Sequence, residues 1–180
     1  YQYDRIKAST CLQDVYTIVP EKDEIPILKA CGSSLNVMGG NNGDVLDRFE
    51  KCCAYWVDLK DEDVLVKFTH DSPLIDAKHI DVVVKKFLND TADFGFLKGF
   101  PKGMHFNMCK VGALKKLVEK ITKEDRAIWN QLNETWVWYR YGFIIRCYEA
   151  PFDFSSINLE VNDMYDLERV RSIASGAGDL

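Results

Sequence analysis

Short runs of β-branched and aromatic residues alternate along this chain with longer segments whose apolar residues recur at helical spacing. The run D-V-L-V-K-F-T at 63–69 is typical of a buried strand, and apolar side chains at helical spacing follow it from Ile80 to Phe87. A second helix begins after Asp44, which occupies an N-cap position. The same pattern predicts strands at 14–20, 35–38, 92–96, 105–110, 143–148 and 159–161, and helices at 24–31, 45–56, 124–133 and around 167–173.

The order of these elements predicts an α/β fold. Strand, loop and helix repeat in turn, and neither an internal repeat nor a low-complexity linker interrupts them. With 180 residues, 47% of them hydrophobic, the chain is large enough to bury one sizeable core. We therefore expect a single domain over residues 1–180, built on a mostly parallel sheet flanked by helices.

Charge and hydropathy exclude several classes of function. The formal net charge is −5 and the basic residues form no cluster, which argues against a nucleic acid partner. The longest apolar runs are far shorter than the roughly 20 residues that cross a bilayer, and no secretion signal is recognisable. These features predict a cytoplasmic protein without a membrane partner, and they still allow a small anionic ligand such as a nucleotide with Mg²⁺.

Polar side chains follow two of the predicted strands. His70 and Asp71 come directly after the strand at 63–69, and Asn162 and Asp163 follow the strand at 159–161. In open α/β sheets, ligands bind in the crevice beyond the carboxyl ends of the strands. Both places carry oxygen ligands, so we expect the functional site there.

Four stretches of the chain together resemble a known family. They are G-D-V-L-D-R-F at 43–49, D-S-P-L-I-D at 71–76, G-F-P-K-G at 99–103 and V-N-D-M-Y-D-L at 161–167. In order and spacing they resemble the cytidylyltransferase branch of the sugar nucleotidyltransferases, which includes the acylneuraminate cytidylyltransferases and the spore-coat polysaccharide enzymes. The resemblance implies a GT-A-like fold that activates a sugar with CTP, uses Mg²⁺ and releases pyrophosphate.

The resemblance assigns the metal to two residues. Asp71 matches the family's metal-binding and catalytic aspartate, although an aspartate before Ser72-Pro73 is also good turn chemistry. Asn162 lies where many relatives carry a second metal-binding aspartate, and its amide oxygen can also ligate Mg²⁺. Asn162 could equally be a plain turn residue. The neighbouring Asp163 is expected to cap the last helix.

Four basic side chains are candidates for binding substrate. Arg48 could contact a phosphate, or pair with Asp44 or Asp47 on a solvated helix face. Lys98 and Lys102 flank glycines in a stretch that resembles a sugar-binding loop, although exposed lysines are common in loops. His70 replaces the glycine that usually precedes the metal-binding aspartate in this family. It could therefore bind phosphate, or crowd the metal.

The chain departs from the family at its beginning. Relatives open with a strand and a glycine-containing basic loop that grips the triphosphate, whereas residues 1–9 already resemble the end of the helix that follows. The fold is therefore expected to be amino-terminally incomplete, and a catalytically inert domain that binds a protein partner or a sugar is the alternative function. The aromatic segment 129–141 could stack on a base, fill the core or support the homodimer that the resemblance implies.

Overall fold

The main sheet has four strands in the spatial order β3, β5, β4, β6. The computed structural model describes residues 1–32, 35–55, 58–130 and 134–176. The bounds are β3 Val64–Lys67, β5 Asn107–Lys110, β4 Phe94–Lys98 and β6 Ile145–Glu149. Strand β5 runs antiparallel to both of its neighbours, and β4 runs parallel to β6. Three of the four strands therefore point the same way, which confirms the expected mostly parallel α/β sheet.

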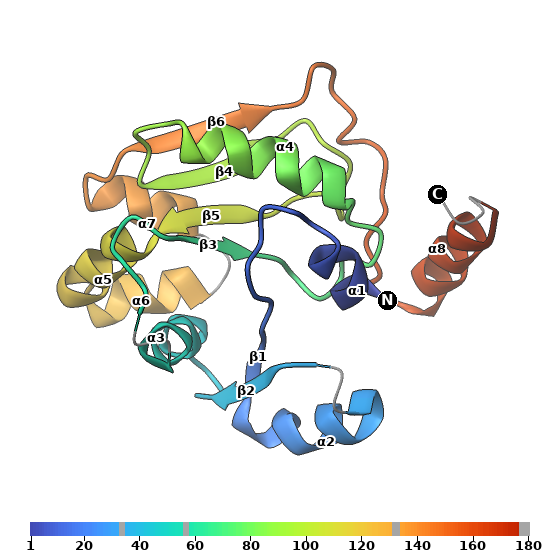
Figure 1. The fold of residues 1–180 in the computed structure, drawn as a ribbon, viewed down its shortest axis with the longest axis horizontal. Coiled ribbons are helices and arrows are strands. Elements are labelled where there is room, and N and C mark those ends of the chain that lie inside the picture. The colour runs from blue at the N-terminus through green and yellow to red at the C-terminus, as the bar shows by residue number, and fades with distance from the viewer. Residues whose placement is uncertain (33–34, 56–57, 131–133, 177–180) are drawn as a thin grey trace.

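A second, two-stranded sheet lies apart from the first (Figure 1). It pairs β1 (Thr17–Pro20) in parallel with β2 (Val37–Gly40), and α2 (Glu21–Cys31) connects the two strands. Helix α3 (Val45–Tyr55) contacts both strands and also packs against α6. Among the strands that the structure describes, β1 pairs only with β2, and β3 pairs only with β5. One edge of β1 and one edge of β3 therefore carry no strand partner.

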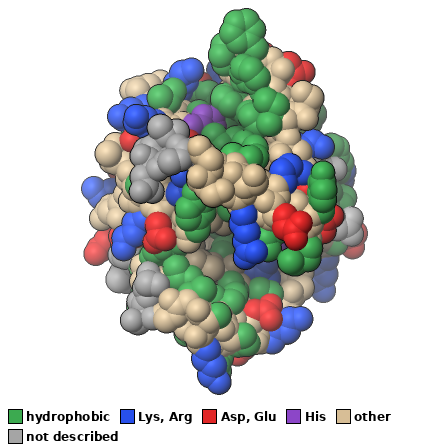
Figure 2. All heavy atoms as spheres, turned by 90° about the vertical axis from the view of Figure 1, so that its right-hand side faces the viewer, with side chains coloured by type: hydrophobic (Ala, Val, Ile, Leu, Met, Phe, Trp, Pro, Cys, Tyr) green, Lys and Arg blue, Asp and Glu red, His purple; other side chains and the backbone are tan. Residues whose placement is uncertain are grey.

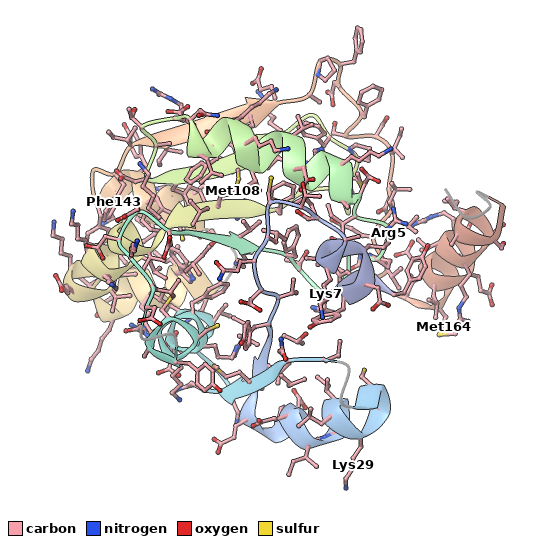
Figure 3. All side chains as sticks on the ribbon, in the orientation of Figure 1. Arg5, Lys7, Lys29, Met108, Phe143 and Met164 are labelled. Carbon is pink, nitrogen blue, oxygen red and sulfur yellow. The ribbon has the colours of Figure 1, made fainter. Side chains whose placement is uncertain are left out.

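Helices cover both faces of the main sheet (Figure 1). Helix α4 (Ala77–Leu88) packs on one face in a cluster that includes Val64, Val66 and Met108 (Figure 3). The other face packs against α3, α5 (Val111–Lys120), α6 (Lys123–Asn130) and α7 (Glu134–Arg140). Leu65 belongs to this second cluster, because successive side chains of a strand point to opposite faces.

Two further helices, one at each end of the described chain, lie beyond these layers. Helix α1 (Gln2–Lys7) contacts α4, and α8 (Met164–Gly176) lies near α1 at the edge of the molecule (Figure 1). The predicted N-cap is confirmed, since Asp44 Oδ1 accepts a 3.0 Å hydrogen bond from the backbone N–H of Asp47. Within the described residues, no helix combines the length and the apolar character that crossing a membrane requires.

The segment 159–161 is not a regular strand, contrary to the sequence prediction. An isolated bridge to Lys102 lies just before it, at Asn158. Beyond that bridge, Glu160 N–H bonds the Asn158 side chain and Val161 N–H bonds the loop at Asp71, so no strand ladder continues. Helix α2 begins at Glu21, three residues earlier than predicted from the apolar pattern. The predicted helix at 124–133 ends as α6 at Asn130 in the described chain, and residues 131–133 lie outside it.

Aromatic residues of the 129–141 segment fill the core. Trp138 is fully buried on α7, with its ring centroid 5.2 Å from that of Phe94 and 4.9 Å from that of Phe143. Trp129 is also buried. Tyr139, on the opposite side of the same helix, is 77% exposed. The core interpretation of this segment is therefore confirmed for the two buried tryptophans, which do not form a stacking platform.

Candidate active site

Asp71 lies in the loop that leaves the carboxyl end of β3. Its Oδ1 accepts hydrogen bonds from Thr69 Oγ1 at 2.5 Å and from Ser72 Oγ at 3.1 Å. The hydroxyls of Thr69 and Ser72 are themselves 3.3 Å apart. Within the described chain, Asp71 Oδ2 has no hydrogen bond or ion pair. One oxygen of this half-buried carboxylate is thus held, and the other is available to a ligand.

Helix α1 fixes the position of this loop from outside. Gln2 Nε2 donates a 2.6 Å hydrogen bond to the carbonyl oxygen of Thr69. Arg5 Nε donates to the carbonyl oxygen of Ile75 at 2.8 Å, and the helix lies on the same side of the molecule as α8 (Figure 3). The sequence pattern gave no signal for these contacts, because they join residues far apart in the chain. The loop that carries Asp71 is therefore braced before any ligand binds.

The residue before the second predicted metal ligand is bonded to the first. Val161 N–H donates a 2.9 Å hydrogen bond to the carbonyl oxygen of Asp71, and Asn162 is the next residue. The backbone N–H of Asn162 bonds Asp166 Oδ2 at 3.1 Å, while Asp163 Oδ1 accepts from Asp166 N–H at 2.8 Å. This reciprocal cap confirms the expected role of Asp163. The exposed Asn162 side chain has no partner among the described residues.

A glycine-containing loop lies against the same segment. Lys102 exchanges backbone hydrogen bonds of 2.9 Å with Ile157 and Leu159. Gly103 has φ +84°, and a Cβ there would meet the backbone of Leu159 at 2.8 Å. Only glycine therefore allows the loop to approach so closely. This contact places the exposed Lys102 next to the segment that leads to Asn162.

His79 supports this loop from α4. Its Nε2 lies 3.1 Å from the carbonyl oxygen of Met104, so Nε2 carries the proton and donates. The ring packs 4.6 Å from Phe100, centroid to centroid. Burial among these groups lowers the pKa of His79. A neutral imidazole therefore serves as a structural contact here.

The other predicted substrate-binding residues are more dispersed. His70 is exposed next to Asp71, as the sequence requires. Lys98, at the end of β4, forms an exposed ion pair with Glu149, at 3.4 Å between Nζ and Oε1. Arg48 belongs to α3 and lies at the end of β2. The structure thus groups Asp71, His70, Asn162 and the Lys102 loop, whereas Lys98 is already paired.

The expected pairing of Arg48 with Asp44 or Asp47 is wrong. Arg48 Nη1 instead donates to the carbonyl oxygen of Asn41 at 2.7 Å, and its buried Nε has no partner in the described part of the chain. The carboxylates are engaged elsewhere, since Asp44 pairs with Arg126 and Asp47 with Lys51. Arg48 turns toward β2 because Gly40 leaves room there; a Cβ on Gly40 would lie 2.8 Å from Arg48 Cγ.

A buried ion pair lies at the end of β3, and the sequence gave no indication of it. Lys67 Nζ lies 2.8 Å from Glu134 Oε1, and Asn107 Nδ2 donates to the same oxygen at 2.5 Å. The side chains of Lys67 and Glu134 are only 15% and 7% exposed. Because burial removes the hydration of both charges, the pair must remain intact for the core to tolerate it. The amide of Asn107 thus adds a hydrogen bond to the Glu134 carboxylate of this pair.

The oxygen donors at the site suit a Mg²⁺ ion that is bound partly by substrate phosphates. They are too few to enclose a metal ion with protein ligands alone. No group of three or more His, Cys, Asp or Glu residues in the described ranges could enclose a metal ion. Mg²⁺ keeps several waters and binds through one or two protein oxygens together with substrate phosphates. The free Oδ2 of Asp71 and the unengaged amide of Asn162 supply such oxygens. Zinc, which needs several nitrogen or sulfur ligands, does not fit.

Comparisons with solved structures place the fold. A cytidylyltransferase from Leptospira borgpetersenii superimposes with a TM-score of 0.79 and 23% sequence identity, covering 97% of this chain and 74% of that one. A CMP:2-keto-3-deoxy-manno-octonic acid synthetase, solved in complex with CTP, superimposes with a TM-score of 0.69 at 13% identity, covering 97% and 86%. The chain therefore has the fold of these cytidylyltransferases.

Sequence comparisons add one relative. An uncharacterized protein from Methanocaldococcus jannaschii is 30% identical over 115 residues, which make up 63% of this chain and 46% of that protein. The match thus spans about half the length of this relative. A scan of known protein families finds no match.

Proposed function

We propose that this chain is a cytidylyltransferase domain that transfers a cytidylyl group from CTP to a sugar, with Mg²⁺, in polysaccharide or glycoconjugate biosynthesis in the cytoplasm. The observation that carries the proposal is the hydrogen bond from Val161 N–H to the carbonyl of Asp71. It joins the residue before Asn162 to Asp71, from segments about half the chain apart, and so supports a shared site. The shared fold supports the same conclusion.

The chemistry determines what these residues would do. The oxygen of a sugar hydroxyl forms a bond to the α-phosphorus of CTP while the bond from that phosphorus to the bridging oxygen breaks. Pyrophosphate leaves with the electron pair, and the hydroxyl proton passes to water. Bound Mg²⁺ supplies charge neutralisation for the phosphates. Asp71 Oδ2 and the Asn162 amide oxygen would hold the metal. Lys102 and His70 are the basic groups that would bind the phosphates or an acidic sugar, since His70 adjoins Asp71 and Lys102 bonds the segment that leads to Asn162.

We propose in addition that part of the nucleotide site is not among these 180 residues. The family that the sequence resembles opens with a strand and a glycine-containing loop that binds the triphosphate. The unpaired edges of β1 and β3 among the described strands support this, since a strand between them would join the two sheets. The partnerless Nε of Arg48, at the end of β2, supplies a further donor for a nucleotide.

Pyrophosphate release tests the proposed activity. The full-length protein, incubated with CTP, Mg²⁺ and a panel of acidic sugars, is expected to release pyrophosphate, and Asp71→Ala is expected to abolish the release. Pyrophosphate release with CTP should also be compared with release with the other nucleoside triphosphates, because the preference for cytosine is part of the proposal. If no sugar supports release, and Asp71→Ala binds nucleotide as the unaltered protein does, the enzyme assignment fails.

An inert binding domain is the second candidate. The observation that favours it is His70, an exposed imidazole directly beside Asp71 where the resembled family has glycine. Replacement of His70 by glycine discriminates the two functions. An enzyme whose metal site His70 crowds should gain activity, whereas an inert domain should show no pyrophosphate release with either residue.

A homodimer is the proposed assembly. Exposed apolar side chains gather on the loop between β6 and α8, at the top of the face shown in Figure 2. They belong to Phe152, Phe154 and Ile157, which are 73%, 38% and 46% exposed. Apolar patches of this kind are typical of protein interfaces. Analytical ultracentrifugation should give twice the chain mass, and the double substitution Phe152→Ser with Phe154→Ser should give the monomer.

A further inference from the structure

The hydroxyl groups of Thr69 and Ser72 both hydrogen-bond to the same oxygen of Asp71, Oδ1. Thr69 Oγ1 lies 2.5 Å and Ser72 Oγ 3.1 Å from Oδ1, and the three atoms form a closed triangle because the hydroxyls are 3.3 Å apart. Both hydroxyls can donate to a carboxylate. The described residues provide no comparable partner for Oδ2. The two oxygens of one carboxylate are therefore unequal before any metal binds.

The two hydroxyls of Thr69 and Ser72 form a clamp on Asp71 Oδ1. The contacts that hold this clamp in place do not depend on a ligand. Ser72 is 2% exposed, so its hydroxyl has almost no access to water as an alternative partner. The backbone of Thr69 is fixed by Gln2, and that of Asp71 by Val161. A rotation of the Asp71 carboxylate would break both hydroxyl contacts. The orientation of the carboxylate is thus set by its two neighbours.

We propose that Thr69 and Ser72 are positioning residues that present Asp71 to the cation through Oδ2 alone. This inference rests on the proposed function, because it takes Asp71 as the metal ligand. A carboxylate fixed in one-oxygen coordination suits Mg²⁺, which requires near-octahedral geometry, and disfavours Ca²⁺, which also accepts two-oxygen coordination in flexible geometry. The clamp therefore selects the smaller cation as well as orienting the ligand.

Mn²⁺ binding in the presence of CTP, followed by electron paramagnetic resonance, tests the clamp without relying on activity. Thr69→Val replaces the hydroxyl with a methyl group of similar size, and Thr69→Ser keeps the hydroxyl as the matched control. Thr69→Val should weaken Mn²⁺ binding by about tenfold or more, the usual effect of losing a group that orients a metal ligand. Ser72→Ala should weaken it in the same direction, and Thr69→Ser should bind as the unaltered protein does.

Competition with Ca²⁺ separates positioning from a general loss of structure. Thr69→Val should lose Mn²⁺ affinity more than Ca²⁺ affinity, because the released carboxylate can rotate to bind Ca²⁺ through both oxygens. Equal losses for the two cations would overturn the selectivity, and unchanged Mn²⁺ binding in Thr69→Val would overturn the clamp. Asp71→Asn distinguishes failure of the proposed metal site from failure of the clamp alone. If Asp71→Asn binds Mn²⁺ as the unaltered protein does, the metal site of the proposed function fails, and the clamp fails with it.

Discussion

Val161 and Asp71 are joined backbone to backbone by a 2.9 Å hydrogen bond from the N–H of the first to the carbonyl oxygen of the second. This contact is not part of any strand pairing in the described residues. It positions the residue after Val161, Asn162, next to the loop that carries the Asp71 carboxylate. Each prediction concerning the site depends on this juxtaposition.

The close approach of Gly103 to Leu159 is expected to hold this juxtaposition in place. Gly103→Ala adds the strain of a left-handed residue, about 1–2 kcal/mol, and a clash with the backbone of Leu159. Gly142→Ala is the matched control, since Gly142 also has positive φ but nothing lies within 4 Å of its Cβ position. Amide hydrogen exchange should show faster exchange at Val161 in Gly103→Ala and not in Gly142→Ala. Equal protection at Val161 in both variants would contradict the proposed support.

Asn162→Asp is expected to strengthen Mg²⁺ binding. A carboxylate in place of the amide adds negative charge at an exposed position whose side chain has no partner in the described chain. The Mg²⁺ concentration for half-maximal pyrophosphate release should fall, by up to about tenfold, and Asn162→Ala should raise it. Asn42→Asp, on the exposed turn before α3, controls for the added charge and should have no effect. Identical Mg²⁺ dependence in all these variants would mean that residue 162 is only a turn residue.

Trp138 is expected to be a major contributor to stability. It is fully buried and packs against Phe94 and Phe143, so Trp138→Ala should lower the free energy of unfolding by about 3–5 kcal/mol. The neighbouring Tyr139 is 77% exposed, and Tyr139→Ala should change the free energy by less than about 0.5 kcal/mol. Urea denaturation of the two variants measures the difference. Similar losses of unfolding free energy in both variants would show that Trp138 is not a core residue.

Asp81 is expected to make stability depend on acid pH. Its carboxylate accepts hydrogen bonds from Ser9 Oγ and from the backbone N–H groups of Thr10 and Cys11. Burial alone would raise the pKa of Asp81, but the hydrogen bonds from Ser9 and Thr10 outweigh it and hold the pKa well below its usual range. A group with a lowered folded-state pKa stabilises the fold fully above its unfolded pKa, about 3.9 for Asp, and loses that contribution as the pH falls toward the folded value.

The comparison of the unaltered protein with Asp81→Asn measures this contribution, because asparagine does not titrate. The difference in the free energy of unfolding should be constant from neutral pH down to about pH 5 and should shrink below about pH 4. A difference that grows as the pH falls would have the opposite sign and would show that Asp81 is not stabilised as a carboxylate.

The regular elements of this fold could be predicted from the sequence because they depend on local patterns. The apolar run at 63–69 contains β3, which is half-buried rather than buried, and Asp44 caps α3 as expected. Segments without such a pattern could not be predicted. Helix α7 was missed because aromatic and β-branched residues mask its helical spacing, and 159–161 carries a strand-like composition but pairs with a loop.

The site could be predicted only in part, for a different reason. Asp71 and Asn162 were predicted as ligands because ligand-binding residues follow the ends of strands, and that prediction stays a prediction. The structure bonds Val161, the residue before Asn162, to Asp71, although 159–161 is not a strand. The bracing by Gln2 and the buried pair of Lys67 with Glu134 join residues 67 positions apart, and nothing in the local pattern marks them. The partners of Arg48 were misjudged for the same reason, because Arg126 and Lys51 occupy the carboxylates that local spacing offered to Arg48.

We propose that Asp71 and Asn162 bind one cation together. Paramagnetic broadening of backbone amide signals by Mn²⁺ with CTP tests it directly, since broadening reports distance to the bound ion. The amide signals of residues 69–72 and of residues 161–163 should broaden together at the same Mn²⁺ concentration, and Asp71→Asn should remove both effects. Broadening of only one of these segments, or broadening that persists in Asp71→Asn, would contradict the claim.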